Sequence, residues 1–332
     1  MAIVKEVIDS FPGAQPLRVI PREEVRLFET PDASMVRFIT ARTEPLAVYS
    51  FPASYEPTKF APPRGVFEGA ILRLEWQTMD GRQPFYHRNA DVDEIGFQVC
   101  GRRTQMTELG AVDIEPGQFS CIPVGVAHDN YGREDIHLIL YMHGPARACI
   151  APVAEGTARI PPFEGWQERP MLEITTNGLG APHCDVASCM IDEVVLLGAA
   201  NEADERMQVL QPSGLLGETE WLYKAAKVWV GHTLLWPSSV RTYLRHLRAD
   251  EIQYQVSGSR ILVTQHGAVA LNPGDFTCIP LGCAFTSITD QESRHISVLT
   301  AERVPPAREP TRFFDLDPAT IIAGEGARER AR

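Results

Sequence analysis

The sequence predicts a mainly all-β protein made of two copies of one barrel-like unit. Residues 101–125 recur as residues 258–282 at a constant offset of 157, with about half of the positions identical. Pro and Gly are frequent (26 and 25 of 332 residues) and scattered, which favours short strands and turns over long helices. The length suits about two domains. A duplicated β-unit so rich in turns favours two barrels or jelly rolls over a solenoid.

The repeat and the distribution of proline divide the chain into five parts. The first part holds nine prolines and only weak periodicity, as in Met35–Ile39, so we expect an extended arm with a few edge strands. The ranges are an N-terminal arm over 1–65, a first barrel over 66–145, a connector over 146–215, a second barrel over 216–302 and a tail over 303–332.

Alternating apolar residues and turn signals define the local elements. Residues 70–76 alternate as a half-buried strand, and Asp80-Gly81 then marks a hairpin turn. Further strands are expected over 103–109, 111–114, 119–122 and 137–143, with a strand-like run over 193–197. Short helices are expected over 199–207 and near 318–323, before a charged, frayed end.

Charge and composition exclude several classes of function. The net charge of −12 argues against a nucleic-acid or anionic-membrane surface. No apolar run approaches the ~18 residues that span a bilayer, and the N-terminus carries acids where a secretory signal is apolar. Seven cysteines without a CxxC pair argue against a disulfide scaffold, and the spacing of Cys184, Cys189 and His183 matches no zinc pattern. We expect a cytoplasmic protein.

Two linked stretches of the first unit carry the metal chemistry. The spacing is His87-x-Asn89-x4-Glu94-x6-Gly101, followed by Gly117-x5-Pro123-x-Gly125-x2-His128. This resembles the two-part cupin signature, with Asn89 where a second histidine usually stands. The resemblance covers both halves of the chain and implies a bicupin, that is, two double-stranded β-helix (jelly-roll) barrels.

Elementary strand geometry agrees with a metal site in the first unit. His87 and Asn89 are two residues apart and face the same way on a strand, whereas Glu94 has the opposite parity and needs an intervening turn or bulge. Two imidazoles and one carboxylate leave positions open, and the natural metal is non-haem Fe(II), with Mn, Zn or Ni as alternatives. Asn89 adds a weak oxygen ligand or binds substrate. Asp93 competes for the carboxylate role, but only Glu94 keeps the motif distance.

The second unit predicts no metal. At the same offset its four positions hold Leu244, His246, Glu251 and Phe285. Two of the four ligands are therefore replaced by apolar residues. A single histidine and a single carboxylate rarely hold a catalytic metal, so we expect this barrel to be degenerate.

The amino-acid sequence of residues 86–94 indicates a resemblance to a narrower group of cupins. It is similar to homogentisate 1,2-dioxygenase and its relatives, which also have a long N-terminal arm, and the His/Asn/Glu/His set resembles the large subunit of two-component hydroquinone dioxygenases. The resemblance implies an iron(II) enzyme that inserts O2 into a small hydroxylated aromatic of homogentisate, gentisate or hydroquinone type. It also implies a homo-oligomer, with a small partner subunit as one option. In homogentisate dioxygenases, however, the iron lies in the C-terminal barrel.

Other residues are candidates for the pocket. Tyr141 and His143 share a strand face, and His143 either orients a phenolate as a base or is a structural histidine. Tyr86 and Arg88 should point away from the metal. Arg103 can bind a carboxylate through two parallel hydrogen bonds, but we favour a surface role for it. Trp76 is expected in the core.

Three functions remain open from the sequence. The first is ring cleavage by an Fe(II) dioxygenase. The second is a cupin lyase, isomerase or hydrolase that uses another metal without O2 chemistry. The third is a non-catalytic binding protein or partner subunit, which would show no turnover as an isolated chain.

Overall fold

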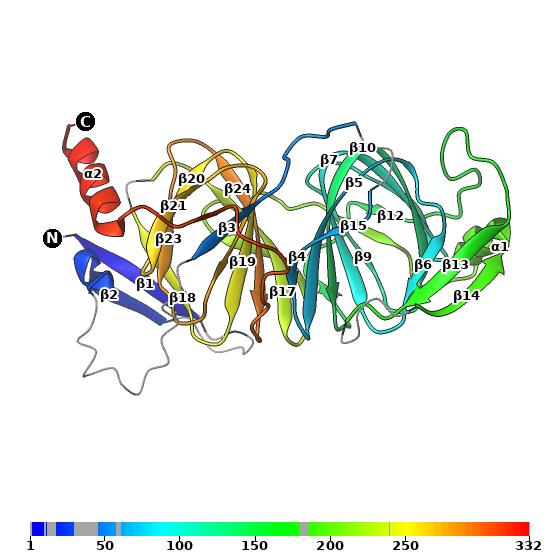
Figure 1. Cartoon of the computed structure of the whole chain (residues 1–332), viewed down its shortest axis with the longest axis horizontal. Helices are drawn as coiled ribbons and strands as arrows, with labels where there is room; N and C mark the ends of the chain where they lie inside the picture. Colours follow the sequence, from blue (N-terminus) through cyan, green and yellow to red (C-terminus); the bar gives the residue numbers. More distant parts are fainter. Residues whose placement is uncertain are drawn as a thin grey trace.

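The chain forms two β barrels that lie side by side (Figure 1). The computed structural model describes residues 2–9, 11, 18–29, 46–57, 61–179, 185–238 and 240–331. The predicted mainly all-β bicupin fold is confirmed by the strand order within these residues. None of the described helices has the length and hydropathy needed to cross a bilayer. The weakly periodic segment 35–39, His183 and Cys184 lie outside the described residues.

A single 11-stranded sheet closes the first barrel. Its strands are β4 (Arg64–Glu68), β5 (Leu72–Arg82), β6 (Tyr86–Asn89), β7 (Asp93–Thr107), β8 (Gly110–Ile114), β9 (Phe119–Ile122), β10 (Ala127–Met142), β12 (Ala154–Glu155), β13 (Met171–Thr176), β14 (Asp185–Ile191) and β15 (Gln208–Leu210). The longest strands, β7 and β10, pair antiparallel along most of their lengths. They form the wall that carries most of the site residues.

Two sheets build the second barrel. The 8-stranded sheet contains β3 (Ala47–Ser50), β11 (Arg147–Ala148), β16 (Thr219–Lys224), β17 (Val228–Leu235), β19 (Asp250–Ser257), β22 (Asp275–Ile279), β24 (Ser293–Thr300) and β25 (Arg312–Phe313). The 6-stranded sheet contains β1 (Ile3–Asp9), β2 (Arg18–Glu23), β18 (Thr242–His246), β20 (Arg260–Thr264), β21 (Gly267–Leu271) and β23 (Phe285–Ile288).

The helices are short and peripheral, and they correct two predictions. They are η1 (Glu24–Leu27), α1 (Glu193–Gly198), η2 (Ala199–Asn201) and α2 (Pro318–Ala331). The strand predicted over 193–197 is wrong, because the Asp192 carboxylate accepts from the backbone N–H groups of Val194 and Val195 and caps a helix there. The helix expected over 199–207 is only the three-residue η2. The C-terminal helix is confirmed and continues to Ala331.

The other predicted strands follow the repeat, but one predicted turn is wrong. Residues 119–122 form β9, while residues 111–114 lie within β8 and 137–142 within β10. The hairpin at Asp80-Gly81 is wrong, because β5 runs on to Arg82, which lies opposite Tyr131 of β10. Pairing with the long strand β10 outweighs the turn preference of the Asp-Gly sequence.

The internal repeat of the sequence is also present in the structure. Gly101 and Gly258 have φ of 69° and 65°, and a Cβ atom at either would lie 2.1 Å from a backbone oxygen across the strand pair. The backbone at these two positions therefore requires glycine. Gly110, Gly117 and Gly125 also share positive φ with their equivalents at the offset of 157. The prediction that 101–125 and 258–282 are equivalent strands is confirmed.

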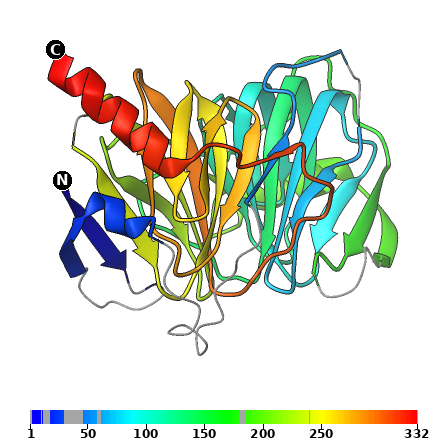
Figure 2. The ribbon, with the colours of Figure 1, turned by 60° about the vertical axis from the view of Figure 1, so that its left-hand side comes forward.

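Each barrel is completed by a segment that precedes the other barrel in the sequence. The N-terminal hairpin β1–β2 adds β1 in parallel to β18 of the second barrel, and the hairpin β13–β14 adds β13 in parallel to β6 of the first. Likewise β3 pairs with β22 and β15 pairs with β9. The two hairpins thus lie at opposite ends of the molecule, and α2 lies at the same end as β1–β2 (Figure 1 and Figure 2). The segments predicted as arm, connector and tail all contribute strands to the barrels.

The largest hydrophobic core lies between the barrels, not within them. Leu72, Leu74 and Trp76 of β5 pack there with Tyr254 and Phe276 of the second barrel, so the expected core position of Trp76 is confirmed. Because strand side chains alternate, the polar residues between them face into the first barrel. The interior of that barrel is consequently polar.

Candidate metal centre

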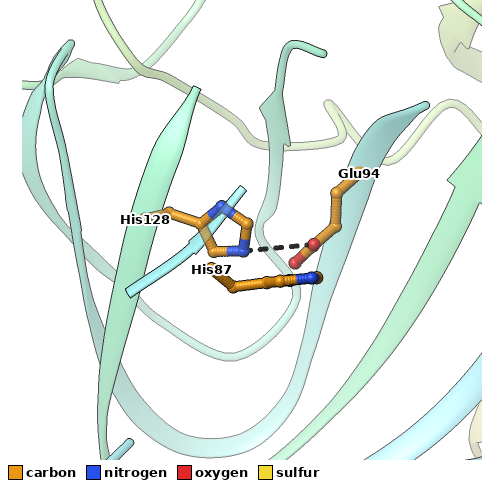
Figure 3. Close-up of side chains that lie close together, drawn as sticks. All are labelled: His87, Glu94 and His128. Atoms are coloured by element: carbon orange, nitrogen blue, oxygen red, sulfur yellow. Dashed lines mark ion pairs between the residues drawn. The ribbon is translucent and has the colours of Figure 1, made fainter. Parts of the chain in front are cut away.

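Three side chains from three strands converge inside the first barrel. His87 comes from β6, Glu94 from the start of β7 and His128 from the start of β10. His128 lies opposite His87 in the β10–β6 pair, which sets the two rings beside each other with centroids 5.3 Å apart. The break between β6 and β7 changes the parity of Glu94, as predicted. Figure 3 shows the three side chains pointing toward one another.

The cluster has the dimensions of a metal site. One ligand atom from each residue lies within 4.8 Å of the others. His128 Nε2 is 3.2 Å from Glu94 Oε2, close to the separation of about 3 Å between neighbouring ligands that each lie about 2.1 Å from one ion. Among the described residues this is the only group of three or more His, Cys, Asp or Glu side chains with such spacing.

The electrostatics suit a cation. Burial lowers the pKa of His87 to about 4, helped by the neighbouring His128, so its ring is neutral and its nitrogen lone pair is available at pH 7. Burial opposes ionisation of Glu94, but charge and hydrogen bonds from His128 lower its pKa to about 2. Burial opposes protonation of His128, whereas Glu94 raises its pKa. The ionised Glu94 carboxylate pairs with His128, and a cation held by the cluster would take the place of the proton on that ring.

Asn89 and Asp93 lie beside the cluster in different roles. Asn89 Nδ2 donates to Glu94 Oε2 at 3.0 Å, and its buried Oδ1 has no partner. Asp93 instead accepts from the backbone N–H groups of Val124 and Ala146 at 2.8 and 2.7 Å. Both carboxylate oxygens of Asp93 are therefore used in holding two loops, which supports the preference for Glu94.

Sequence reasoning missed two charged residues that reach the same interior. Arg73 and Glu75 alternate with the core residues of β5, and Tyr141 lies opposite Arg73 on one side and Glu94 on the other. Arg73 Cζ lies 4.2 Å from the centroid of the Tyr141 ring, and Arg73 Nε is 3.2 Å from Glu75 Oε1. Burial raises the pKa of Glu75 to about 7. The alternating sequence of β5 indicates that Arg73 and Glu75 share one face of the strand. It does not indicate that this face points into the barrel.

The remaining candidates separate into buried and exposed positions. His143 follows the end of β10, is exposed, and places Nδ1 3.3 Å from the backbone oxygen of Asp91, which fits the structural alternative and not a base. Tyr86 points away from the cluster, and its hydroxyl donates to Glu193. Arg88 also points away and pairs with Glu173. The predicted orientations of Tyr86 and Arg88 are confirmed.

The expected surface position of Arg103 is wrong. Its side chain is 1% exposed and lies in the interior of the first barrel. The reason is a bulge around Gly101, between Gln98 and Arg102, where the regular pairing of β7 with β10 is interrupted. Even-numbered residues such as Glu94 face inward before the bulge, and odd-numbered residues such as Arg103 face inward after it.

The equivalent place in the second barrel is closed by an internal ion pair. Phe285 lies opposite Leu244, as His128 lies opposite His87. His246 Nε2 is 2.6 Å from Glu251 Oε2, and its Nδ1 is 2.6 Å from Asp9 Oδ2 of the N-terminal hairpin. Burial disfavours the charged ring, but these two acids raise the pKa of His246 to about 10. The carboxylates contact opposite sides of the ring and do not converge on a common point.

Comparison with known proteins finds distant likeness to solved structures and no match in sequence. No family model and no curated protein matches the sequence. Among solved structures, a cupin 2 conserved barrel domain protein from Leptotrichia buccalis is 8% identical with a TM-score of 0.44, over 74% of this chain and 92% of that one. A point mutant of Bacillus subtilis oxalate decarboxylase is 12% identical with a TM-score of 0.47, over 86% and 85%. Likeness at this level carries no substrate or metal to this chain.

The fold and the cluster together define what the site can do. The strand order is that of a bicupin, and the first barrel holds a buried set of two histidines and one glutamate. Such a set occupies one face of a metal ion and leaves further positions open to other ligands. The arrangement therefore supports a metal-dependent cupin with its site in the first barrel.

Proposed function

We propose that this protein is a non-haem Fe(II) dioxygenase that cleaves the ring of a hydroxylated aromatic compound of hydroquinone, homogentisate or gentisate type. The observation that carries the proposal is the buried cluster of His87, Glu94 and His128. Two imidazoles and one carboxylate are the ligand set typical of Fe(II) oxygenases. The aromatic substrate rests on the resemblance of residues 86–94 to homogentisate and hydroquinone dioxygenases.

The three ligands have separate tasks in this proposal. His87 and His128 each supply one neutral nitrogen donor, and Glu94 supplies a negative charge. Asn89 holds Glu94 in place through its amide N–H, as residues around metal ligands commonly do. When bound, Fe(II) supplies a Lewis acid and an electron donor for O2, and it lets both reactants meet in a fixed geometry.

Glu75 is the group best placed to take a proton from a phenolic substrate. It is buried on the inner face of β5, and its pKa of about 7 suits a general base at neutral pH. Arg73 Nε lies 3.2 Å from Glu75 Oε1 and steadies the carboxylate once it ionises. Tyr141, between Arg73 and Glu94 in the strand register, forms one wall for the ring.

The second candidate is a cupin enzyme that uses Mn, Zn or Ni without O2 chemistry. The same three ligands suit these metals, because imidazole and carboxylate bind all of them. The specific observation in its favour is Glu75, since a buried base beside a Lewis acid also suits lyase or isomerase chemistry. We also propose that the protein is a homo-oligomer in the cytoplasm, and a small partner subunit remains an option.

Oxygen uptake tests the proposal. Protein purified without air is loaded with Fe(II), Mn(II) or Zn(II) and given a panel of hydroquinones with and without carboxylates, while an electrode follows O2. We expect uptake that needs both a para-diol and Fe(II), with one O2 consumed per ring cleaved. Turnover of a substrate without O2 consumption would favour the second candidate. Complete inactivity that is relieved only by another protein would favour a partner subunit.

A further inference from the structure

The interior of the first barrel contains polar atoms whose hydrogen bonds are not made within the protein. These buried atoms are Asn89 Oδ1, Gln98 Oε1, Arg103 Nε, Arg103 Nη2, Gln105 Oε1, Ser120 Oγ and His137 Nε2. Buried polar groups are normally paired, and each exception requires an explanation. The most costly member of the group is Arg103, because a guanidinium always carries its charge.

The two carboxylates whose charges act on Arg103, those of Asp135 and Glu94, already interact with other side chains. Asp135 accepts from Gln98 Nε2 at 2.6 Å through one oxygen and contacts His137 Nδ1 at 2.9 Å through the other. Glu94 belongs to the metal cluster. Within the described residues no carboxylate forms an ion pair with Arg103. Burial lowers the pKa of Arg103, while Asp135 and Glu94 act in the opposite direction.

In the second barrel, the arginine at the equivalent position is hydrogen-bonded to neighbouring side chains. Arg260 is the equivalent of Arg103, and its Nε, Nη2 and Nη1 donate to Gln255, Gln253 and Ser287 at 2.8, 2.6 and 2.6 Å. The residue that receives Nη2 there, Gln253, has Gly96 as its equivalent in the first barrel. The first barrel therefore lacks the acceptor of Nη2, whereas the acceptor of Nε has its equivalent in Gln98, whose Oε1 makes no hydrogen bond.

Gly96 also fixes where the open edge lies. A Cβ atom at Gly96 would come within 2.6 Å of Arg103 Nη2 and 3.1 Å of Ser120 Oγ, so the guanidinium lies against the bare backbone of β7. Gly96 and Glu94 are two residues apart on the inward face of the same strand, a distance of about 7 Å. The open edge and the metal cluster thus face the same interior, within the length of one substituted aromatic ring.

We propose that Arg103 binds the carboxylate of the substrate through Nε and Nη2, with Ser120 beside it, and so makes the protein specific for hydroxylated aromatics that carry a carboxylate. Nε–H and Nη2–H lie parallel on one edge of the guanidinium and match the two oxygens of a carboxylate. The ring hydroxyl would then reach the metal cluster. This inference rests on the proposed function for the aromatic ring, but the anion site stands on Arg103 alone.

Binding of two matched probes tests the inference without turnover. Phenylacetate and its neutral isostere phenylacetamide are titrated into the metal-loaded protein by calorimetry, in the absence of O2. We expect phenylacetate to bind about 10- to 100-fold more tightly than phenylacetamide, which is the range for charge-assisted hydrogen bonds. We expect Arg103→Gln to remove this preference, and the matched control Arg260→Gln to retain it.

A second variant keeps the inference testable if Arg103→Gln does not fold. Gly96→Gln keeps Arg103 but supplies the amide that Gln253 provides in the second barrel, and the clash it creates is with the end of a flexible side chain. It should also abolish the preference while metal content and melting temperature stay near those of the wild type. Equal affinity of the two probes in the wild type, or a preference that survives in both Arg103→Gln and Gly96→Gln, would overturn the inference.

The same probes separate this inference from the proposed function. A protein that consumes no O2 with any hydroquinone but still prefers phenylacetate would retain the anion site and lose the dioxygenase. A protein that consumes O2 equally well with neutral hydroquinone and with its carboxylate-bearing analogues would retain the dioxygenase and lose the anion site.

Discussion

The two barrels share their outer frame and differ in their interior. In the first barrel, Arg88 of β6 pairs with Glu173 of the hairpin β13–β14. In the second barrel, the equivalent Arg245 of β18 pairs with Glu6 of the hairpin β1–β2. Both arginines also donate to a turn carbonyl, that of Gly125 or Gly282. The frame is therefore maintained by contacts that do not depend on the chemistry within.

The interiors differ at most of the positions that the proposed chemistry uses, although Glu94 has an identical counterpart in Glu251 and Arg103 in Arg260. The offset and the strand registers match His87 with Leu244, His128 with Phe285, Tyr141 with Leu299 and Glu75 with Gly231. Where the first barrel presents an ionised carboxylate to an open cluster, the second pairs Glu251 with a protonated His246. The second barrel therefore satisfies its buried carboxylate with a protonated histidine, where the first barrel brings three possible metal ligands together.

The largest expected effect is loss of metal from the first barrel. His128→Ala turns its ligand set toward the Phe285 arrangement of the second barrel, and we expect bound metal to fall to near zero, because an incomplete facial set binds weakly. His87→Ala and Glu94→Ala should do the same. Metal analysis of the purified variants measures this, with Asn89→Ala as the control that keeps most of its metal. Full metal and full activity in His128→Ala would show that the site lies elsewhere.

The next effect concerns the base. Glu75→Gln keeps the shape of the side chain but removes the carboxylate, so turnover should fall about 10²- to 10⁴-fold, the range for one general base. Metal content should be unchanged, since Glu75 is not a member of the cluster. Steady-state rates measured from pH 5 to 9 should lose the limb near pH 7 that the pKa of Glu75 predicts. A normal rate in Glu75→Gln would assign the base to another group.

The third effect sharpens the contrast with the second barrel. His246→Ala leaves Glu251 buried without its cation, and we expect a loss of about 3–5 kcal/mol in the free energy of unfolding. Because the folded pKa of His246 is about 10 and its ordinary value is 6.5, its stabilisation is complete below pH 6.5 and is lost as pH rises through 10.

Denaturant unfolding at several pH values checks this prediction. The stability gap between wild type and His246→Ala should narrow by up to about 1.4 kcal/mol per pH unit between pH 7 and 9. Bound metal should stay near one equivalent in the variant. Loss of most of the metal from folded His246→Ala would mean that the two barrels have been assigned the wrong way round.

The smallest effect distinguishes the two neighbouring acids. Asp93→Asn should keep its metal but lose about 1–3 kcal/mol of unfolding free energy, because the amide cannot accept from both Val124 and Ala146. The equivalent Asp250 accepts from Leu281 in the same way, so this role belongs to the shared frame. If Asp93→Asn lost its metal while Glu94→Gln kept it, the carboxylate ligand would be Asp93.

The fold and the metal cluster could be predicted because each leaves a regular pattern in the sequence, an internal repeat for the fold and a motif of fixed spacing for the cluster. The offset of 157 located equivalent strands, and motif spacing located His87, Glu94 and His128. Arg103 could not be placed correctly, because alternation alone puts it outside and the bulge at Gly101 reverses the parity of β7. Arg73 and Glu75 were missed for a related reason, since the apolar face of β5 packs against the other barrel.

The exchange of hairpins could not be predicted, because it depends on pairings between distant parts of the chain. Asp9 contacts His246 across 237 positions of sequence, and no local pattern encodes such a pairing. The helix over Glu193–Gly198 was mistaken for a strand because its run of Val and Leu suits both structures. The Asp192 cap was the available signal that decided between them.

Metal stoichiometry tests the central contrast between the barrels most directly. The protein is purified without air, stripped of metal, and titrated with Fe(II) or Mn(II) while bound metal per chain is measured in wild type, His128→Ala and His246→Ala. We predict one equivalent in wild type, none in His128→Ala and one in His246→Ala. Two equivalents in the wild type, or one equivalent that is lost only in His246→Ala, would contradict the assignment of the site to the first barrel.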